Sequence, residues 1–223
     1  MTPVQWVGSE PEFGQRVFVV APHPDDEVLG CAGIMCWLDA AGTNVEIIAV
    51  TDGDASHARS TCITGSELVV RRDAERRAAL EELGVAHLRI ERLGFPDSRV
   101  AGRERDLVRS LTSRIDREST VIVPWRHDGH PDHEAVARAG LAAARTTGAR
   151  CLEVPIWTRV RGRRYSATHV LDLGSTAARK RSAAAHFQSQ NEALGPDPLD
   201  GPVVHPNELE MLTSSTEVII GPR

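Results

Sequence analysis

The stretch RVFVVAPHPDDEVL, residues 16–29, guides the interpretation of the whole chain. Its first part, Val17 to Ala21, is a short run of apolar residues rich in β-branched side chains, which is typical of a buried strand. After Glu27 the apolar residues recur at spacings of mostly three and four, which predicts a helix. The turn between them carries one histidine and three carboxylates: His23, Asp25, Asp26 and Glu27. In an open α/β sheet such a turn lies at the carboxyl end of a strand, where ligands bind.

A metal ion would explain why these charged residues are adjacent. Neighbouring carboxylates repel one another, and a buried strand beside them raises the cost of charging them. Histidine nitrogen and aspartate oxygen are ordinary zinc ligands, so His23 and Asp26 could bind a metal while Asp25 stays free as a base. The alternative is helix capping, in which an aspartate accepts backbone N–H bonds and interacts favourably with the helix dipole. Capping explains one aspartate better than two aspartates and a histidine between prolines.

Composition limits the class of protein. The chain has 223 residues, of which 41% are hydrophobic, so it can form one α/β domain with a sizeable core. Its net charge of −5 argues against a nucleic-acid partner, because phosphate binding needs concentrated positive charge. There is no N-terminal apolar signal and no apolar run near 18 residues, so we expect no membrane span and a cytoplasmic location. The four cysteines form no C-x-x-C pair and are interpreted as small hydrophobic residues.

Alternating apolar strands and amphipathic helices predict the fold. We expect a single doubly wound, three-layer αβα domain with a mostly parallel, Rossmann-like sheet. The predicted strands are residues 17–21, 45–50, 86–92, 120–124 and 151–155, and the helices between them include 67–83, 107–115 and 134–146. A polar arm, residues 1–15, comes first. After the fifth strand we expect a hairpin of residues 157–160 and 166–172, a helix at 175–190, a loop, a short helix at 207–212 and a strand at 217–220.

A second polar cluster follows the predicted strand 120–124. It contains five residues with metal-binding or acid–base side chains: His127, Asp128, His130, Asp132 and His133. A doubly wound fold can bring it beside the first cluster, because both follow parallel strands. The predicted metal ligands are His23, Asp26 and His133, with water in the fourth position. Asp25 would then take a proton from that water, and His130 would donate to an oxyanion.

Two alternatives to a catalytic metal remain. The clusters could be surface residues around helix N-termini, or they could form a closed structural zinc site. The apolar strands before both clusters count against the first alternative. The absence of thiolate ligands counts against the second, since histidine and carboxylate suit an open catalytic site better. Nucleophile, dinucleotide and P-loop interpretations lack their motifs: G-x-S-x-G, G-x-G-x-x-G and the Walker sequence.

APHPDDE at residues 21–27 and HPDH at residues 130–133 closely resemble the marks of the PIG-L, or LmbE-like, family of zinc-dependent N-deacetylases. TDGD at 51–54 and LGFPD at 93–97 are further similarities. The resemblance covers roughly residues 14–190, which leaves 191–223 as a C-terminal extension of one domain, 1–223. It implies the same three metal ligands, Asp25 as the base and His130 at the oxyanion. It also implies Zn²⁺, although two histidines and a carboxylate suit Fe²⁺ as well.

The resemblance further implies a hydrolase acting on a small-molecule amino-sugar substrate. Arg72 and Asp97 match positions that contact substrate hydroxyls in relatives, although a surface charge and a turn residue are the simpler explanations. Asp128 is placed on the substrate side, where it could orient His130 or the water. A thiol-conjugate amidase of the same fold and a non-catalytic sugar-binding or metal-binding protein remain alternatives. An oligomer is possible.

Overall fold

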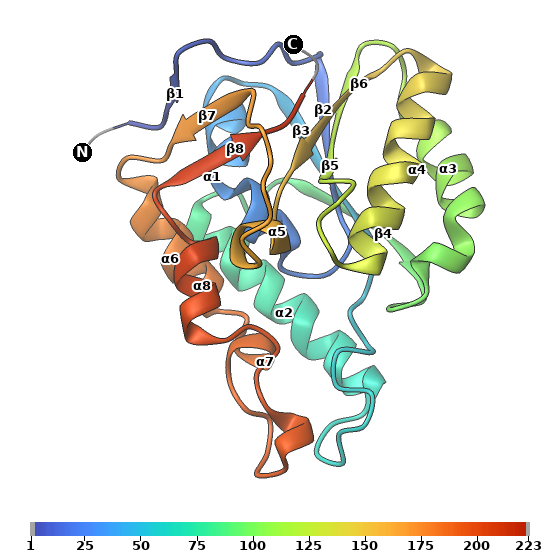
Figure 1. Cartoon of the computed structure of the whole chain (residues 1–223), viewed down its shortest axis with the longest axis vertical. Helices are drawn as coiled ribbons and strands as arrows, with labels where there is room; N and C mark the ends of the chain where they lie inside the picture. Colours follow the sequence, from blue (N-terminus) through green and yellow to red (C-terminus); the bar gives the residue numbers. More distant parts are fainter. Residues whose placement is uncertain (1–2, 222–223) are drawn as a thin grey trace.

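The computed structural model describes residues 3–221 (Figure 1). Met1 and Thr2 of the predicted arm lie outside the described residues, as do the last two residues of the chain. A five-stranded sheet with the order β4-β3-β2-β5-β6 forms the centre, and all its neighbouring strands are parallel. Its strands are β2 (Arg16–Ala21), β3 (Asn44–Thr51), β4 (Arg89–Phe95), β5 (Ser119–Pro124) and β6 (Arg150–Val154).

Helices cover both faces of this sheet, as Figure 1 shows. One apolar core joins the sheet to α1 (Asp26–Ala40) and α2 (Gly65–Leu83). A second core joins it to the 3₁₀ helix η1 (Val100–Arg103), α3 (Glu104–Thr112) and α4 (Pro131–Thr147). Buried strands of valine and isoleucine supply apolar side chains to both cores. The predicted doubly wound αβα architecture is therefore confirmed.

The strand order places the two polar clusters together. From β2 the chain moves outward to β3 and β4, and it then returns to the other side of β2 to form β5 and β6. The neighbouring strands β2 and β5 are thus the point where the winding direction changes, and Val19 pairs in register with Ile122. Ligands of open α/β sheets bind beyond the carboxyl ends of the strands at such a point.

A second, antiparallel sheet has the order β1-β7-β8. It consists of β1 (Gln5–Val7), β7 (His169–Asp172) and β8 (Thr216–Ile219), so the predicted arm and the predicted C-terminal strand share one sheet. The predicted hairpin of residues 157–160 and 166–172 is wrong. Residues Trp157–Val160 form the short helix α5, because the buried carboxylate of Asp128 accepts the backbone N–H groups of residues 156, 157 and 158 and holds them in a turn.

Other element boundaries also differ from the prediction. Strand β4 begins three residues later than expected, because Val85 N–H closes on Leu80 O and Leu88 N–H on Val85 O after α2. The predicted helix 175–190 is two helices, α6 (Thr176–Ala185) and α7 (Gln188–Asn191). The C-terminal segment then contains the 3₁₀ helix η2 (Pro198–Asp200) and α8 (Pro206–Leu212). Within residues 3–221, none of the helices combines the length and apolar composition needed to cross a lipid bilayer.

Helix α1 packs closely against the small sheet. A Cβ on Gly33 would stand 2.1 Å from Leu173 Cδ2, so only glycine permits this approach. Glu217 of β8 accepts the backbone N–H groups of Gly33 and Ile34 at 3.0 and 2.9 Å. Its carboxylate also forms a fully buried ion pair with Lys180 of α6 at 2.7 Å. The helix that begins at the first polar cluster is therefore held by residues near the C-terminus.

Candidate metal centre

Three ligand atoms from the two clusters converge at the carboxyl ends of β2 and β5. Nδ1 of His23 lies 3.1 Å from Oδ2 of Asp26, and Nε2 of His133 lies 3.2 Å from that oxygen. The two ring nitrogens are 3.3 Å apart. A tetrahedral zinc with bonds of about 2.0–2.1 Å separates its ligand atoms by about 3.3 Å. The three predicted ligands thus fit one ion of this size.

The local structure explains the convergence. His23 stands in the turn after β2, and its backbone N–H donates to Asp26 Oδ2 at 2.9 Å, which fixes the carboxylate at the start of α1. His133 projects from the first turn of α4. His130 lies beside the same centre, since its nitrogen, with one each from His23 and His133, falls in a group of potential ligand atoms within 4.8 Å of one another.

Carboxylates also face the outer nitrogens of both ligand rings. Nδ1 of His133 donates to Asp128 at 2.9 Å, and Nε2 of His23 lies 3.2 Å from Asp97 and 3.5 Å from Asp132. Histidines that bind metals commonly donate their second ring N–H to a carboxylate, because this fixes the tautomer and makes the other nitrogen a better ligand. This pattern favours metal ligation over surface histidines around helix N-termini.

The site favours positive charge. Burial lowers the pKa of His133, but Asp26 and Asp128 more than offset this and raise it to about 9. Burial likewise opposes charge on His23, yet its hydrogen bonds to Asp132, Asp26 and Asp97 raise its pKa well above the usual value. A region that stabilises imidazolium in this way also stabilises a divalent cation.

Asp128 contacts His133 and the start of α5. It is completely buried and is not among the residues that line the pocket, so its contact with substrate stays a prediction. It orients His133, and it accepts the three N–H groups at the start of α5. Despite burial, the bond from His133 and these backbone donors hold its pKa below the usual value.

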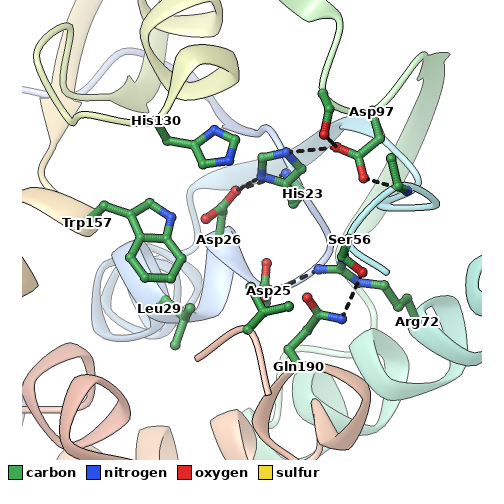
Figure 2. Close-up of a pocket in the computed structure, with 13 residues that line it drawn as sticks. His23, Asp25, Asp26, Leu29, Ser56, Arg72, Asp97, His130, Trp157 and Gln190 are labelled. Carbon is green, nitrogen blue, oxygen red and sulfur yellow. Dashed lines mark hydrogen bonds and ion pairs between the residues drawn. The ribbon is translucent and has the colours of Figure 1, made fainter. Parts of the chain in front are cut away.

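Asp25 and Arg72 line a pocket together with the predicted metal ligands His23 and Asp26 (Figure 2). Burial raises the pKa of Asp25 to about 7, although Arg72 Nη2 is 3.3 Å from its Oδ2. Arg72 is only 2% exposed, so it is not a surface charge. It donates to the carbonyl oxygens of Gly53 at 3.1 Å and Pro24 at 3.0 Å. Its role here is to hold the turn that carries Asp25.

The hydrogen bond at Nδ1 of His130 leaves its Nε2–H available as a donor at the pocket wall. Its Nδ1 accepts the N–H of Asp132 at 3.3 Å and so caps α4. Burial and the charges of His133 and His23 lower the pKa of His130 to about 4. A neutral ring that accepts at Nδ1 carries its proton on Nε2. His130 stands just before the first residue of α4, Pro131.

Asp97 lies at the opposite end of the pocket from Trp157 (Figure 2). It accepts the N–H of Ala55 at 2.8 Å and faces His23. Although burial opposes its charge, the bond to His23 helps to lower its pKa to about 2. Asp97 therefore contacts the predicted metal ligand His23, and its contact with substrate stays a prediction.

Several residues that line the pocket were not predicted from the sequence. The pocket has a volume of about 220 Å³, and its other walls come from loops and from short helices far apart in the chain: Leu29, Ser56, Ser98, Trp157, Gln190 and Val203. Gln190 was predicted only as the last residue of the helix 175–190. Trp157 was assigned to a strand, and no local pattern marked it as a pocket residue.

Residues 18–144, more than half of the chain, match the family described as GlcNAc-PI de-N-acetylase, PIG-L. The chain belongs to the PIG-L family. It is 31% identical over 139 residues to a diacetylchitobiose deacetylase of Thermococcus kodakarensis, which covers 60% of this chain and 51% of that protein. It is 30% identical over 135 residues to a probable N-acetyl-α-D-glucosaminyl L-malate deacetylase 2 of Bacillus cereus, covering 58% and 60%. The chain thus spans about half of the first relative's length.

The fold of this PIG-L chain is also found in solved structures. A conserved protein from Thermus thermophilus superposes with a TM-score of 0.68, covering 93% of this chain and 94% of that one. The two are 24% identical, so the likeness shows the fold.

Proposed function

We propose that this chain is a metal-dependent N-deacetylase that removes an acetyl or other short acyl group from an amino sugar or a glucosamine conjugate. The proposal is carried by the convergence of His23 Nδ1, Asp26 Oδ2 and His133 Nε2 within 3.1–3.3 Å of one another beside a pocket. Membership of the PIG-L family and the activities named for the two relatives support it.

His23, Asp26 and His133 would hold the metal. We propose zinc, and Fe²⁺ is the alternative because two histidines and one carboxylate also suit iron. The bound ion would supply Lewis acidity and make water a nucleophile near neutral pH.

Asp25 is the proposed general base. It faces the pocket, and its pKa of about 7 suits proton transfer at neutral pH. It takes the proton of the attacking water and returns it to the leaving amine. Arg72 holds Asp25 in place through one ion pair and two bonds to backbone oxygens.

His130 is the proposed oxyanion donor. Its Nε2–H is free to donate because Nδ1 already accepts a backbone N–H. Removing one such donor from an active site typically costs about 10²- to 10³-fold in turnover. The polar residues at the other end of the pocket, Asp97, Ser56 and Gln190, are suited to the hydroxyls of a sugar.

The test is a substrate screen with metal control. Purified protein is assayed for acetate and primary-amine release from N-acetylglucosamine, N,N′-diacetylchitobiose and N-acetylglucosaminyl malate, before and after chelation. We expect equimolar acetate and amine, loss of both after chelation and recovery when Zn²⁺ or Fe²⁺ is added. Hydrolysis that persists after complete metal removal, or no hydrolysis by metal-loaded protein, would overturn the proposal. Turnover of a cysteinyl-glucosamine conjugate alone would identify the amidase instead.

A further inference from the structure

Two neighbouring arginines contact the loop that precedes His130. They belong to the segment Arg161–Arg164, which follows α5. Arg161 Nη1 donates to the carbonyl oxygen of Gly129, and Arg163 Nη1 donates to that of His127 at 3.3 Å. A Cβ on Gly129 would stand 2.8 Å from Arg161 Nη1 and 3.2 Å from Arg163 Cζ. The two guanidinium groups therefore approach the same backbone position and are neighbours.

This arginine pair lies next to the residues that form one end of the pocket. Trp157 and His130 form that end, away from Asp97 and Arg72 (Figure 2). Arg161 Cζ lies 5.6 Å from the centre of the Trp157 ring, and Gly129 directly precedes His130. Arg161 thus lies against one residue that lines this end of the pocket, and Arg163 lies against the backbone just before the other.

The pair has no acidic partner within the part of the chain described, residues 3–221. Neither Arg161, Arg163 nor the adjacent Arg164 forms an ion pair there, whereas Arg126, which precedes the same loop, is paired with Glu153. Glu134 approaches the loop, but its carboxylate accepts the N–H of Gly129 at 3.0 Å. The two neighbouring guanidinium charges repel one another, and an anion bound between them would offset the repulsion.

The N–H groups of Arg161 and Arg163 that do not donate to the backbone are suited to binding an anion. Each guanidinium has five N–H groups in a planar fork, and one nitrogen of each donates to a backbone oxygen. The unused N–H groups can bind a carboxylate or phosphate in the two-bond geometry that arginine favours. All three arginines of the segment are exposed, so a ligand can reach them.

We propose that Arg161 and Arg163 bind an anionic substituent, phosphate or carboxylate, carried by the sugar, so that the preferred substrate is a negatively charged N-acylglucosaminide. This inference rests on the proposed function, because it assigns the substrate class of the same site. It makes Arg161 and Arg163 specificity-determining residues that act beyond the Trp157 end of the pocket.

The test compares matched substrates with the metal-loaded full chain. The neutral reference is methyl N-acetylglucosaminide, and the anionic substrates are N-acetylglucosamine 1-phosphate, its 6-phosphate and N-acetylglucosaminyl malate. We expect kcat/KM for at least one anionic substrate to exceed that of the reference by about tenfold or more at low salt, since hydrogen bonds to charged groups are strong. This advantage should shrink as the ionic strength rises. The phosphate and malate arms show which anion is preferred.

The double variant R161Q/R163Q should lower the ratio of anionic to neutral kcat/KM about tenfold or more, mainly through KM. The control is R117Q/R145Q, which removes two exposed charges near the amino ends of β5 and β6 and should keep the wild-type ratio. A ratio that is unchanged in R161Q/R163Q would overturn this inference and leave the proposed function standing. Preference for N-succinylglucosamine over every sugar-linked anion would overturn it too, because the charge would then belong to the acyl group.

Binding supplies a measurement that needs no turnover. Calorimetry with glucosamine 1-phosphate and glucosaminyl malate should show at least one product analogue binding about tenfold more weakly to R161Q/R163Q than to the wild type or R117Q/R145Q. If no substrate is hydrolysed, the proposed function fails, and this titration still decides whether the arginine pair binds the anion. Equal affinities for both analogues in all three proteins would overturn the inference.

Discussion

At the scale of single residues, the predicted metal ligands are distinct from the carboxylates that orient them. His23 and His133 each turn one nitrogen toward Asp26 and the other toward a carboxylate, Asp97 or Asp128. Asp25 stands next to a ligand in sequence, but its ion-pair partner is Arg72. Metal affinity and turnover should therefore respond to different substitutions.

Asp25→Asn should abolish turnover without releasing the metal. The amide keeps the shape of the carboxylate but cannot take a proton, and loss of a general base costs about 10²- to 10⁴-fold. Metal content by mass spectrometry and kcat measured on one preparation check this. Full activity in this variant would remove Asp25 from the mechanism.

Asp128→Asn should weaken metal binding about 10- to 100-fold, because the carboxylate that orients His133 is lost. Competition with a chelator of known affinity measures the effect. Asp116→Asn is the control, since Asp116 is largely exposed and pairs with Arg16 far from the site. Equal metal affinity in both variants would contradict the assigned role of Asp128.

At the scale of elements, the side chain of Arg72 in α2 packs against Gly53 in the loop after β3. Gly53 has a φ of +70°, and a Cβ there would stand 2.2 Å from Arg72 Nη1. Glycine is thus required twice, for its backbone conformation and for the room that it leaves. Through these contacts Arg72 of α2 fixes the position of Asp25.

Gly53→Ala should displace the Arg72 guanidinium and lower activity sharply as well as stability. Gly42→Ala is a matched control, because Gly42 has a φ of +74° and open space around its Cβ position. The control should lose about 1–3 kcal/mol of stability from backbone strain alone. Thermal midpoints and kcat of both variants separate strain from displacement. Similar activity losses in the two would show that the contact with Arg72 does not matter.

At the scale of the whole molecule, segments from near both ends of the chain form the small sheet that packs against α1. Strands β1 and β8 flank β7 in one small sheet (Figure 1). The side chain of Glu217 in β8 contacts both α1 and α6. We expect the C-terminal extension to unfold together with the parallel sheet as a single domain.

Glu217→Ala should lower the free energy of unfolding by about 3–5 kcal/mol, because it leaves the charge of Lys180 buried and unpaired. Adding Lys180→Met should restore part of this loss, since the uncompensated charge is removed. Glu210→Ala, an exposed position in α8, should change little. Urea unfolding followed by fluorescence and circular dichroism gives the free energies. Two separate transitions in the wild type would contradict the single unit.

The sequence predicted much of the fold and the metal ligands. Strands of β-branched residues and helical spacing identified the five parallel strands, although β4 was shifted. The residue types in the turns after β2 and β5 marked His23, Asp26 and His133, because few local structures need that combination. The segment 157–160 was assigned to a strand because its local pattern does not reveal a carboxylate from another loop.

The sequence by itself determined which residues can bind a metal and that they follow parallel strands. Only the tertiary structure decided that Asp128 contacts His133, that Arg72 is buried against Asp25 and that Trp157 lines the pocket. The physical reason is that local patterns record backbone periodicity and burial. Contacts between side chains far apart in the chain depend on strand order and on how each loop satisfies its backbone hydrogen bonds.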